Sequence, residues 1–279
     1  NTFEELNDIL FAGTENGIYK TINNGENWSL SGLGTLHVKS LVKKDNMLFA
    51  GTDYSVYIST NEGISWLNTG LNKPVFSLAL CSSAVFAGTY IRGIYKSTNN
   101  GINWVQTSLN NLTVNALAVK DIYTYAGTNA DGIFVSTNIG LTWTQTPLNN
   151  MTINTIFVYN NYIFTGTNAG IFYSSDNGEN WFEYNDGLIP NTKVMSIAAS
   201  NNTLFVGTEG YSVWKRPDSF VQIGIVSTGF PQMYSISQNY PNPFNPQTKI
   251  KFTVPKTSYT KLIIYDLLGR EVTTLVNQE

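Results

Sequence analysis

An eight-residue motif ending in tryptophan recurs at a nearly constant spacing, and it constrains the fold more than any other feature of the sequence. It reads TINNGENW, STNEGISW, STNNGINW, STNIGLTW and SSDNGENW, and ends at Trp28, Trp66, Trp104, Trp143 and Trp181. Successive tryptophans are 38, 38, 39 and 38 residues apart. A fixed period of this size indicates a repeat architecture, in which each unit is one supersecondary element and neighbouring units share a core.

Each repeat unit contains four short strand signals. A Gly-Thr motif precedes every tryptophan motif: it is FAGT ending at Thr14, Thr52 and Thr89, then YAGT at Thr128, FTGT at Thr167 and FVGT at Thr208. An alternating apolar run such as VNALAV comes before it, and a short pair such as GIFVS comes after it. These segments are rich in β-branched and aromatic residues, are bounded by Gly, Asn or Asp, and show no helical period. Four antiparallel strands about every 40 residues form a propeller blade, so we predict an all-β fold, a β-propeller of about six four-stranded blades over residues 1–226.

The tryptophan motif is predicted to form the hairpin between the third and fourth strands of each blade. Its third residue is Asn or Asp, whose side-chain carbonyl can accept from the backbone N–H two residues on. Its glycine supplies a positive φ, and its tryptophan is expected to pack flat on the neighbouring sheet with a partner for the indole N–H. Trp104→Ala would then cost about 3–5 kcal/mol, as for other buried aromatic residues. The third residue, the glycine and the tryptophan of each copy are Asn23, Gly25 and Trp28; Asn61, Gly63 and Trp66; Asn99, Gly101 and Trp104; Asn138, Gly140 and Trp143; and Asp176, Gly178 and Trp181.

The outermost units depart from the pattern. In the sixth unit, aligning Trp214 with Phe172 puts Arg216, Asp218, Phe220 and Ile223 where the motif has Ser, Asn, Gly and Trp. The motif is lost there, although FVQIGIV can still supply a fourth strand. In the first unit FEEL stands in place of the apolar first strand. The direct count is six blades, and a seventh further upstream remains open.

The motif Ser/Thr-x-Asp/Asn-x-Gly-x-x-Trp resembles the Asp-box of the sialidase and sortilin-like propellers, and the resemblance covers roughly residues 1–226. It implies that the boxes lie on the rim, away from the central funnel where ligands bind, and that they are structural. A calcium loop is the functional alternative, but the spacing lacks the carboxylate series that such a loop requires.

Composition excludes several classes of function. The net charge is −3, with 13% charged residues, so no basic field exists to hold a nucleic-acid backbone. One cysteine and one histidine rule out an internal disulfide and a cysteine or multi-histidine metal cluster, and we predict no metal and no cofactor. Cys81, in the apolar run FSLALCSS, is expected to be a buried, inert thiol. No apolar run approaches the ~20 residues of a membrane span.

The C-terminal residues use a different pattern. We predict a linker over 227–234 and a separate domain over 235–279. The residues QNYPNPFNP, KIKFTVP, IYDLLGREV and the distal TLV resemble the C-terminal sorting domain of type IX (Por) secretion system cargo from Bacteroidetes-related bacteria. The resemblance implies export to the cell surface or medium through the secretion machinery. It also implies an Ig-like β-sandwich. In the family this domain continues through an Ala-Gly-x-Tyr segment, which the residues up to Glu279 do not include, so we expect a partial sandwich.

The candidate enzyme functions make different demands on the charged residues. Sialidases hold the substrate carboxylate with an arginine triad, and the only arginines here are Arg92, Arg216 and Arg270, the last in the tail, so a sialidase is excluded. An Asp-box endo-glucanase would need two converging carboxylates. Candidates on the face formed by the strand 2–3 and 4–1 loops are Glu15, Asp53, Asp131, Asp186 and Glu209.

We expect non-catalytic binding of a glycan or an extracellular protein by a monomer. Asp53, Tyr90, Arg92, Asp131 and Glu209, on strand 2–3 loops predicted to face the funnel, are the candidate binding residues, and Tyr54 and Tyr211 lie on the same loops. Ordinary rim decoration is the alternative for each of them. The repeat also resembles photosystem-assembly propellers of plants and cyanobacteria, but those are basic and this chain is acidic.

Overall fold

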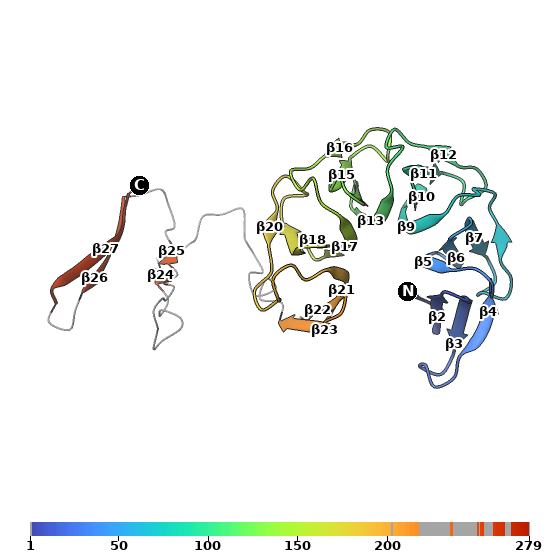
Figure 1. The fold of residues 1–279 in the computed structure, drawn as a ribbon, viewed down its shortest axis with the longest axis horizontal. Coiled ribbons are helices and arrows are strands. Elements are labelled where there is room, and N and C mark those ends of the chain that lie inside the picture. Colours follow the sequence, from blue (N-terminus) through green and yellow to red (C-terminus); the bar gives the residue numbers. More distant parts are fainter. Residues whose placement is uncertain are drawn as a thin grey trace. The chain divides into compact units, whose positions relative to one another are not determined.

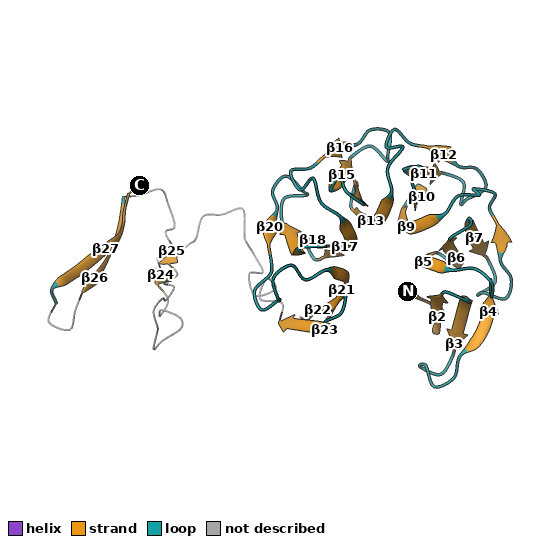
Figure 2. Ribbon diagram, viewed as in Figure 1, coloured by secondary structure: helices purple, strands orange, loops and turns teal. Residues whose placement is uncertain are grey.

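The structure, a computed structural model, describes residues 2–201, 203–217, 235–236, 250, 252–253, 259–265 and 269–278. It divides into two compact units, Asn1–Pro217 and Asp218–Glu279. Strands and loops make up all of the described residues, without a helix (Figure 2). The predicted boundary at residue 226, the linker 227–234 and the fourth strand of the sixth blade lie outside the described residues.

The first unit is a β-propeller, as predicted (Figure 1). Five blades are four-stranded antiparallel sheets in sequence order, and the described strands of the sixth are three. The first three blades comprise β1 (Thr2–Leu6), β2 (Ile9–Thr14), β3 (Gly17–Thr21) and β4 (Ser29–Gly32); β5 (Val38–Lys44), β6 (Met47–Thr52), β7 (Val56–Ser59) and β8 (Leu67–Asn68); and β9 (Val75–Cys81), β10 (Ala84–Thr89), β11 (Ile94–Ser97) and β12 (Val105–Gln106). The other three comprise β13 (Val114–Lys120), β14 (Tyr123–Thr128), β15 (Ile133–Ser136) and β16 (Thr144–Gln145); β17 (Ile153–Tyr159), β18 (Tyr162–Thr167), β19 (Gly170–Ser174) and β20 (Phe182–Glu183); and β21 (Val194–Ser200), β22 (Thr203–Thr208) and β23 (Val213–Pro217).

In the second unit, the described residues form two two-stranded antiparallel sheets. The first pairs β24 (Ser235–Ile236) with β25 (Phe252–Thr253), and the second pairs β26 (Thr260–Tyr265) with β27 (Glu271–Gln278). The segment QNYPNPFNP, on which the resemblance to a sorting domain chiefly depends, lies outside the described residues.

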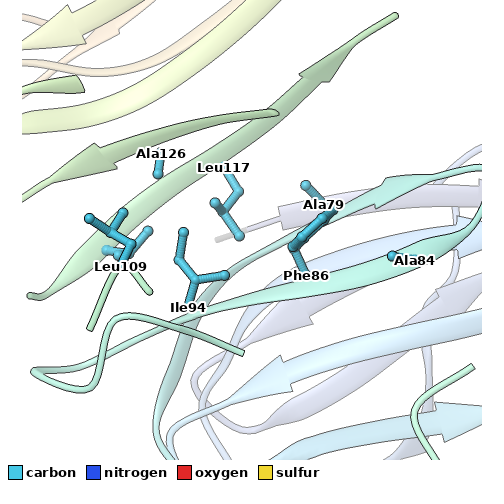
Figure 3. Close-up of a cluster of buried hydrophobic side chains, with 8 residues drawn as sticks. Ala79, Ala84, Phe86, Ile94, Leu109, Leu117 and Ala126 are labelled. Atoms are coloured by element: carbon cyan, nitrogen blue, oxygen red, sulfur yellow. The ribbon is translucent and has the colours of Figure 1, made fainter. Parts of the chain in front are cut away.

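The core of the propeller lies between blades. The cluster shared by the third and fourth blades brings Phe86 and Ile94 against Leu117 and Ala126, with Leu109 from the loop that joins the blades (Figure 3). Burying a side chain such as Phe86, which is 0% exposed, stabilises the fold by about 1.5–3 kcal/mol. Each blade is therefore stabilised mainly by its neighbours.

The box residues form a type I′ hairpin held by side-chain hydrogen bonds. In the third blade Asn100 and Gly101 have φ of 53° and 85°, the left-handed pair that such a turn requires. The Ser97 hydroxyl donates to Asn99 Oδ1 (2.9 Å) and accepts from Gly101 N–H (2.8 Å). The same bonds recur in the other four boxes.

The predicted Asx turn was wrong in its register. Asn99 Oδ1 accepts from the N–H of Asn103, four residues on, at 2.9 Å. The N–H two residues on belongs to Gly101, and the left-handed turn directs it to the Ser97 hydroxyl instead. The Asn99 side-chain carbonyl thereby accepts from the residue before the tryptophan. The equivalent Asn does so in three of the other boxes, and the Asp176 carboxylate does so in the fifth.

The box tryptophans of the second to fifth blades are half-buried against the clusters shared with the preceding blade. Trp104 donates from Nε1 to Thr69 Oγ1 of the preceding blade (3.1 Å), and Trp181 donates to Gly178 O (3.2 Å). The Nε1 atoms of Trp66 and Trp143 are buried without an acceptor among the described residues, contrary to expectation. Partial burial also lowers the expected cost of Trp104→Ala below that of a fully buried aromatic residue.

Candidate functional site

The end of the propeller axis at the strand 2–3 loops is lined by two sets of side chains. The first, which we call the turn ring, follows the Gly-Thr motif. Its members are Glu15, Asp53, Tyr90, Asn129, Asn168 and Glu209. In four of its members the backbone N–H donates to the residue that precedes the innermost strand, as from Asp53 to His37 O (3.1 Å) and from Tyr90 to Pro74 O (3.1 Å). These bonds hold the turn ring beside the innermost strands.

The second set consists of bulged residues near the start of the innermost strands, which we call the bulge ring. In the second blade Val38 pairs with Thr52 and Ser40 pairs with Gly51, which leaves Lys39 as an extra, unpaired residue. A bulge of this kind redirects a side chain out of the regular alternation of the strand. The bulge ring comprises Lys39, Phe76, Asn115, Asn154 and Met195.

The two rings meet in an aromatic and charged cluster between the second and third blades. Lys39 Nζ lies 3.8 Å from the centroid of the Phe76 ring, and the rings of Phe76 and Tyr90 are 5.8 Å apart. Burial lowers the pKa of the Lys39 ammonium, and the Asp53 carboxylate opposes that shift. Tyr90 remains 49% exposed. The arrangement, here called the Lys39–Tyr90 shelf, offers two aromatic rings tilted by 38° to each other, with a cation over the first ring and the Asp53 carboxylate nearby.

Apart from Met195, the other members of the two rings are polar, and several of their side chains are hydrogen-bonded within the propeller. Asn115 and Asn154 donate from Nδ2 to the carbonyls of Ile153 and Val194 on the next innermost strand, each at 3.0 Å. Lys193 pairs with Glu209 at 3.1 Å. The two asparagine bonds tie neighbouring blades together, and the Lys193–Glu209 pair lies within the sixth blade. These side chains are therefore less available to a ligand than those of the Lys39–Tyr90 shelf.

The five candidate binding residues fall into three places. Asp53 and Tyr90 belong to the shelf, whereas Glu209 lies in the turn ring of the sixth blade, paired with Lys193. Arg92 and Asp131 stand at the far end of their loops, where their carbonyls accept from Gln106 and Gln145 of the outermost strands, both at 2.7 Å. The structure brings two of the five together.

Sequence reasoning missed Lys39 and Phe76. Both stand in innermost strands, where a regular alternation assigns residues to core or solvent, and the bulge breaks that alternation. The signal was available in the repeat alignment. The residue after the first valine or isoleucine of each innermost run is Lys, Phe, Asn, Asn and Met in the second to sixth blades.

A separate cavity of about 430 Å³ lies between the fifth and sixth blades, lined by Tyr184, Trp214 and Arg216 among others. Arg216 pairs with Asp186 at 3.4 Å and lies over the Tyr184 ring at 4.0 Å. The cavity lies where the sixth unit has lost its box, since Arg216 occupies the position of the box serine.

Within the described residues, no group of three His, Cys, Asp or Glu side chains could hold a metal ion, and no helix is long and apolar enough to span a membrane. Cys81 is half-buried at the end of β9, with Sγ 3.7 Å from Ser83 Oγ, rather than buried as predicted.

Comparison with known proteins identifies the fold. No family model matches the sequence, and no curated protein matches it. The extracellular domain of the putative one-component system BT4673 from B. thetaiotaomicron is similar in structure, with a TM-score of 0.63, 18% identity, and coverage of 76% of this chain and 32% of that one. YCF48 bound to D1 peptide gives a TM-score of 0.59 and 18% identity over 75% of this chain and 74% of that one.

An ancestral GH74 enzyme is also similar, with a TM-score of 0.57, 20% identity, and coverage of 100% of this chain and 40% of that one. The chain thus spans about a third of the BT4673 domain and two-fifths of the GH74 enzyme. At these identities the similarities establish the β-propeller fold, and function has to be argued from the site.

Proposed function

We propose that this protein is an extracellular binding propeller that holds a glycan or a protein, without catalysis, at the Lys39–Tyr90 shelf. The observation that supports this is the contact series Lys39–Phe76–Tyr90 beside Asp53. An exposed aromatic face packs against the apolar face of a sugar ring or against an aliphatic side chain, and adjacent charged groups orient the ligand. The half-exposed Tyr90 ring beside two charged groups favours a glycan as the first candidate.

The test is a glycan array combined with capture of extracellular proteins, using Tyr90→Ala and the control Tyr211→Ala. Tyr211 also lies on a strand 2–3 loop and is 53% exposed, but it belongs to the sixth blade. We expect Tyr90→Ala to weaken binding about tenfold, since losing one stacking aromatic residue costs about 0.5–1.5 kcal/mol beyond buried area, whereas Tyr211→Ala leaves it unchanged. Equal losses for both variants would contradict the location of the site.

Hydrolysis of a polysaccharide is the second candidate, favoured by the similarity to the GH74 enzyme. It requires two carboxylates flanking the scissile bond, for which Asp131 and Glu209 are the candidates. Turnover on a polysaccharide panel that disappears in Asp131→Ala or Glu209→Ala would replace the binding proposal with this one.

Export is proposed to depend on residues 235–279. The support is the resemblance of this segment to a type IX sorting domain, together with the extracellular origin of the BT4673 domain. We expect the full chain in the surface or secreted fraction of its native host and a chain ending at residue 234 inside the cell. Cytoplasmic full-length protein would contradict the proposal. We further propose that the exported protein is a monomer, to be checked by light scattering.

A further inference from the structure

The five junctions between successive blades share one set of contacts. The aromatic residue before the Gly-Thr motif of one blade packs against the box glycine of the next. A β-carbon added at Gly63 would lie 2.6 Å from Phe11 Cε1, and one at Gly140 would lie 2.8 Å from Phe86 Cε1. Gly101 and Gly178 approach Phe49 and Tyr125 in the same way, at 3.7 and 3.6 Å. The fifth junction lacks a box and keeps only the contact described next.

The glycine of each Gly-Thr motif approaches the first residue of the next innermost strand. A β-carbon at Gly13, Gly51 or Gly88 would lie 2.7 Å from the side chain of Val38, Val75 or Val114. Gly127 and Gly166 approach Ile153 and Val194 in the same way. All five of these valine and isoleucine side chains are 0% exposed. A lysine of the third strand adds a bond to the next box, from Lys20 to Glu62 O (3.3 Å) and from Lys96 to Ile139 O (2.9 Å).

The first and sixth blades each present one side of such a junction with no blade packed against it. Innermost strands pack against one another in sequence from β1 through β21, but β21 and β1 do not form such a pair, and Figure 1 shows the ring open between β22–β23 and β2–β3. On the sixth blade, Phe205 is 36% exposed, whereas the five equivalent aromatic residues are at most 1% exposed. A β-carbon at Gly207 would meet only Ser196 of its own blade.

The first blade presents the complementary half. Its box glycine, Gly25, has only Trp28 nearby, and Trp28 is 40% exposed. Phe3, which is 65% exposed, lies beside it with ring centroids 6.4 Å apart. A monomeric protein seldom leaves such matched apolar faces open to water.

We propose that one further blade of this same repeat occupies the opening, and that the same protein carries this blade before β1. Its box would cover Phe205, its first innermost residue would pack against Gly207, and its own aromatic residue would cover Gly25 and Trp28. A blade of this repeat is the single element that supplies both halves of the junction. It is placed before β1 because a blade there continues the series of repeats directly, whereas after the sixth unit the sequence changes to the different pattern of residues 235–279.

A second complete copy does not meet the requirement. One copy already occupies most of the turn around the axis (Figure 1). If the first blade of a second copy entered the opening, its second blade would fall on the first blade of the original copy. The remaining alternative is that the sixth blade packs directly against the first and closes the ring. The experiment below distinguishes this closure from an added blade.

The test fuses a copy of residues 153–194 directly before Asn1. This length keeps the repeat register, because Thr2 pairs with Gly13 as Ser196 pairs with Gly207. In a Cys81→Ser background, Phe205→Cys places a thiol in the opening. We expect its alkylation to slow about tenfold or more when the added blade covers it, and the thermal midpoint to rise. The control fusion carries Phe164→Ala and Trp181→Ala in the added copy only, and should leave both readouts unchanged.

Two results would overturn the proposal. One is an alkylation rate that is the same with and without the intact added blade. The other is spontaneous formation of a disulfide between Asn24→Cys and Phe205→Cys in the unfused Cys81→Ser chain, which would show that the six blades close on themselves.

Discussion

The junction between the second and third blades and the opening between the sixth and first are built from the same sequence motifs, yet they differ in burial. At the junction, Phe49 is 0% exposed, Gly101 approaches it, and Trp104 reaches back to Thr69. At the opening, Phe205 and Trp28 are 36% and 40% exposed. A motif in this protein therefore folds its own hairpin but acquires its stabilising contacts from the neighbouring blade, as in other repeat proteins.

The largest predicted contrast between box residues concerns the tryptophans. Trp104→Ala should lower the free energy of unfolding by about 2–4 kcal/mol, somewhat below the value for a fully buried aromatic residue, because Trp104 is half-buried and loses a bond to Thr69. Trp28→Ala should cost about 1 kcal/mol or less, since no preceding blade covers that indole. Urea unfolding of both variants measures the difference, and a cost for Trp28→Ala equal to that for Trp104→Ala would break the comparison.

The hydroxyl of the first residue of each box should contribute equally to stability at the junction and at the opening. Ser97→Ala removes the donor to Asn99 and the acceptor for Gly101 N–H, and Thr21 makes the same bonds at the opening. Both truncations to alanine should cost about 1–2 kcal/mol, because each leaves a box N–H without its acceptor. A much smaller loss of unfolding free energy for Thr21→Ala would mean that the first hairpin is itself not formed. The difference between the junction and the opening would then not arise from the contacts between blades alone.

The smallest effect is expected at the only box whose third residue is a carboxylate, Asp176, rather than an asparagine. Burial acts to raise the pKa of Asp176, but hydrogen bonds from the backbone and side chain of Asn180 and from Ser174 outweigh it and lower the pKa below its usual 3.8. A lowered folded-state pKa contributes stability above the unfolded pKa of about 4, and this contribution is lost as the pH falls through the folded value. Asp176→Asn should therefore cost about 0.5 kcal/mol or less at pH 7, because the group is only partly buried and solvent screens its charge. It should also flatten the acid limb of the stability profile, and an unchanged acid limb would contradict this assignment.

The strands and their order could be read from the sequence because the local signals agree with one another. In each repeat the hydrophobic runs, the Gly-Thr motif and the turn before the box glycine all specify the same four-stranded unit. The positions of Lys39 and Phe76 could not be read in this way, because a bulge is a property of strand pairing, and one extra residue reverses the face that a side chain occupies. The exposure of Trp28 was also hidden, since its box is intact in sequence and only the absence of a covering blade sets it apart.

The most direct test compares two equivalent phenylalanines, one inside a junction and one at the opening. Phe86 and Phe205 both precede Ala/Val-Gly-Thr in β10 and β22, and differ in having or lacking a box-bearing blade against them. We predict that Phe86→Ala lowers the free energy of unfolding by about 3–5 kcal/mol and Phe205→Ala by about 1 kcal/mol. Equal losses in urea unfolding would contradict the claim that stability resides in the junctions between blades.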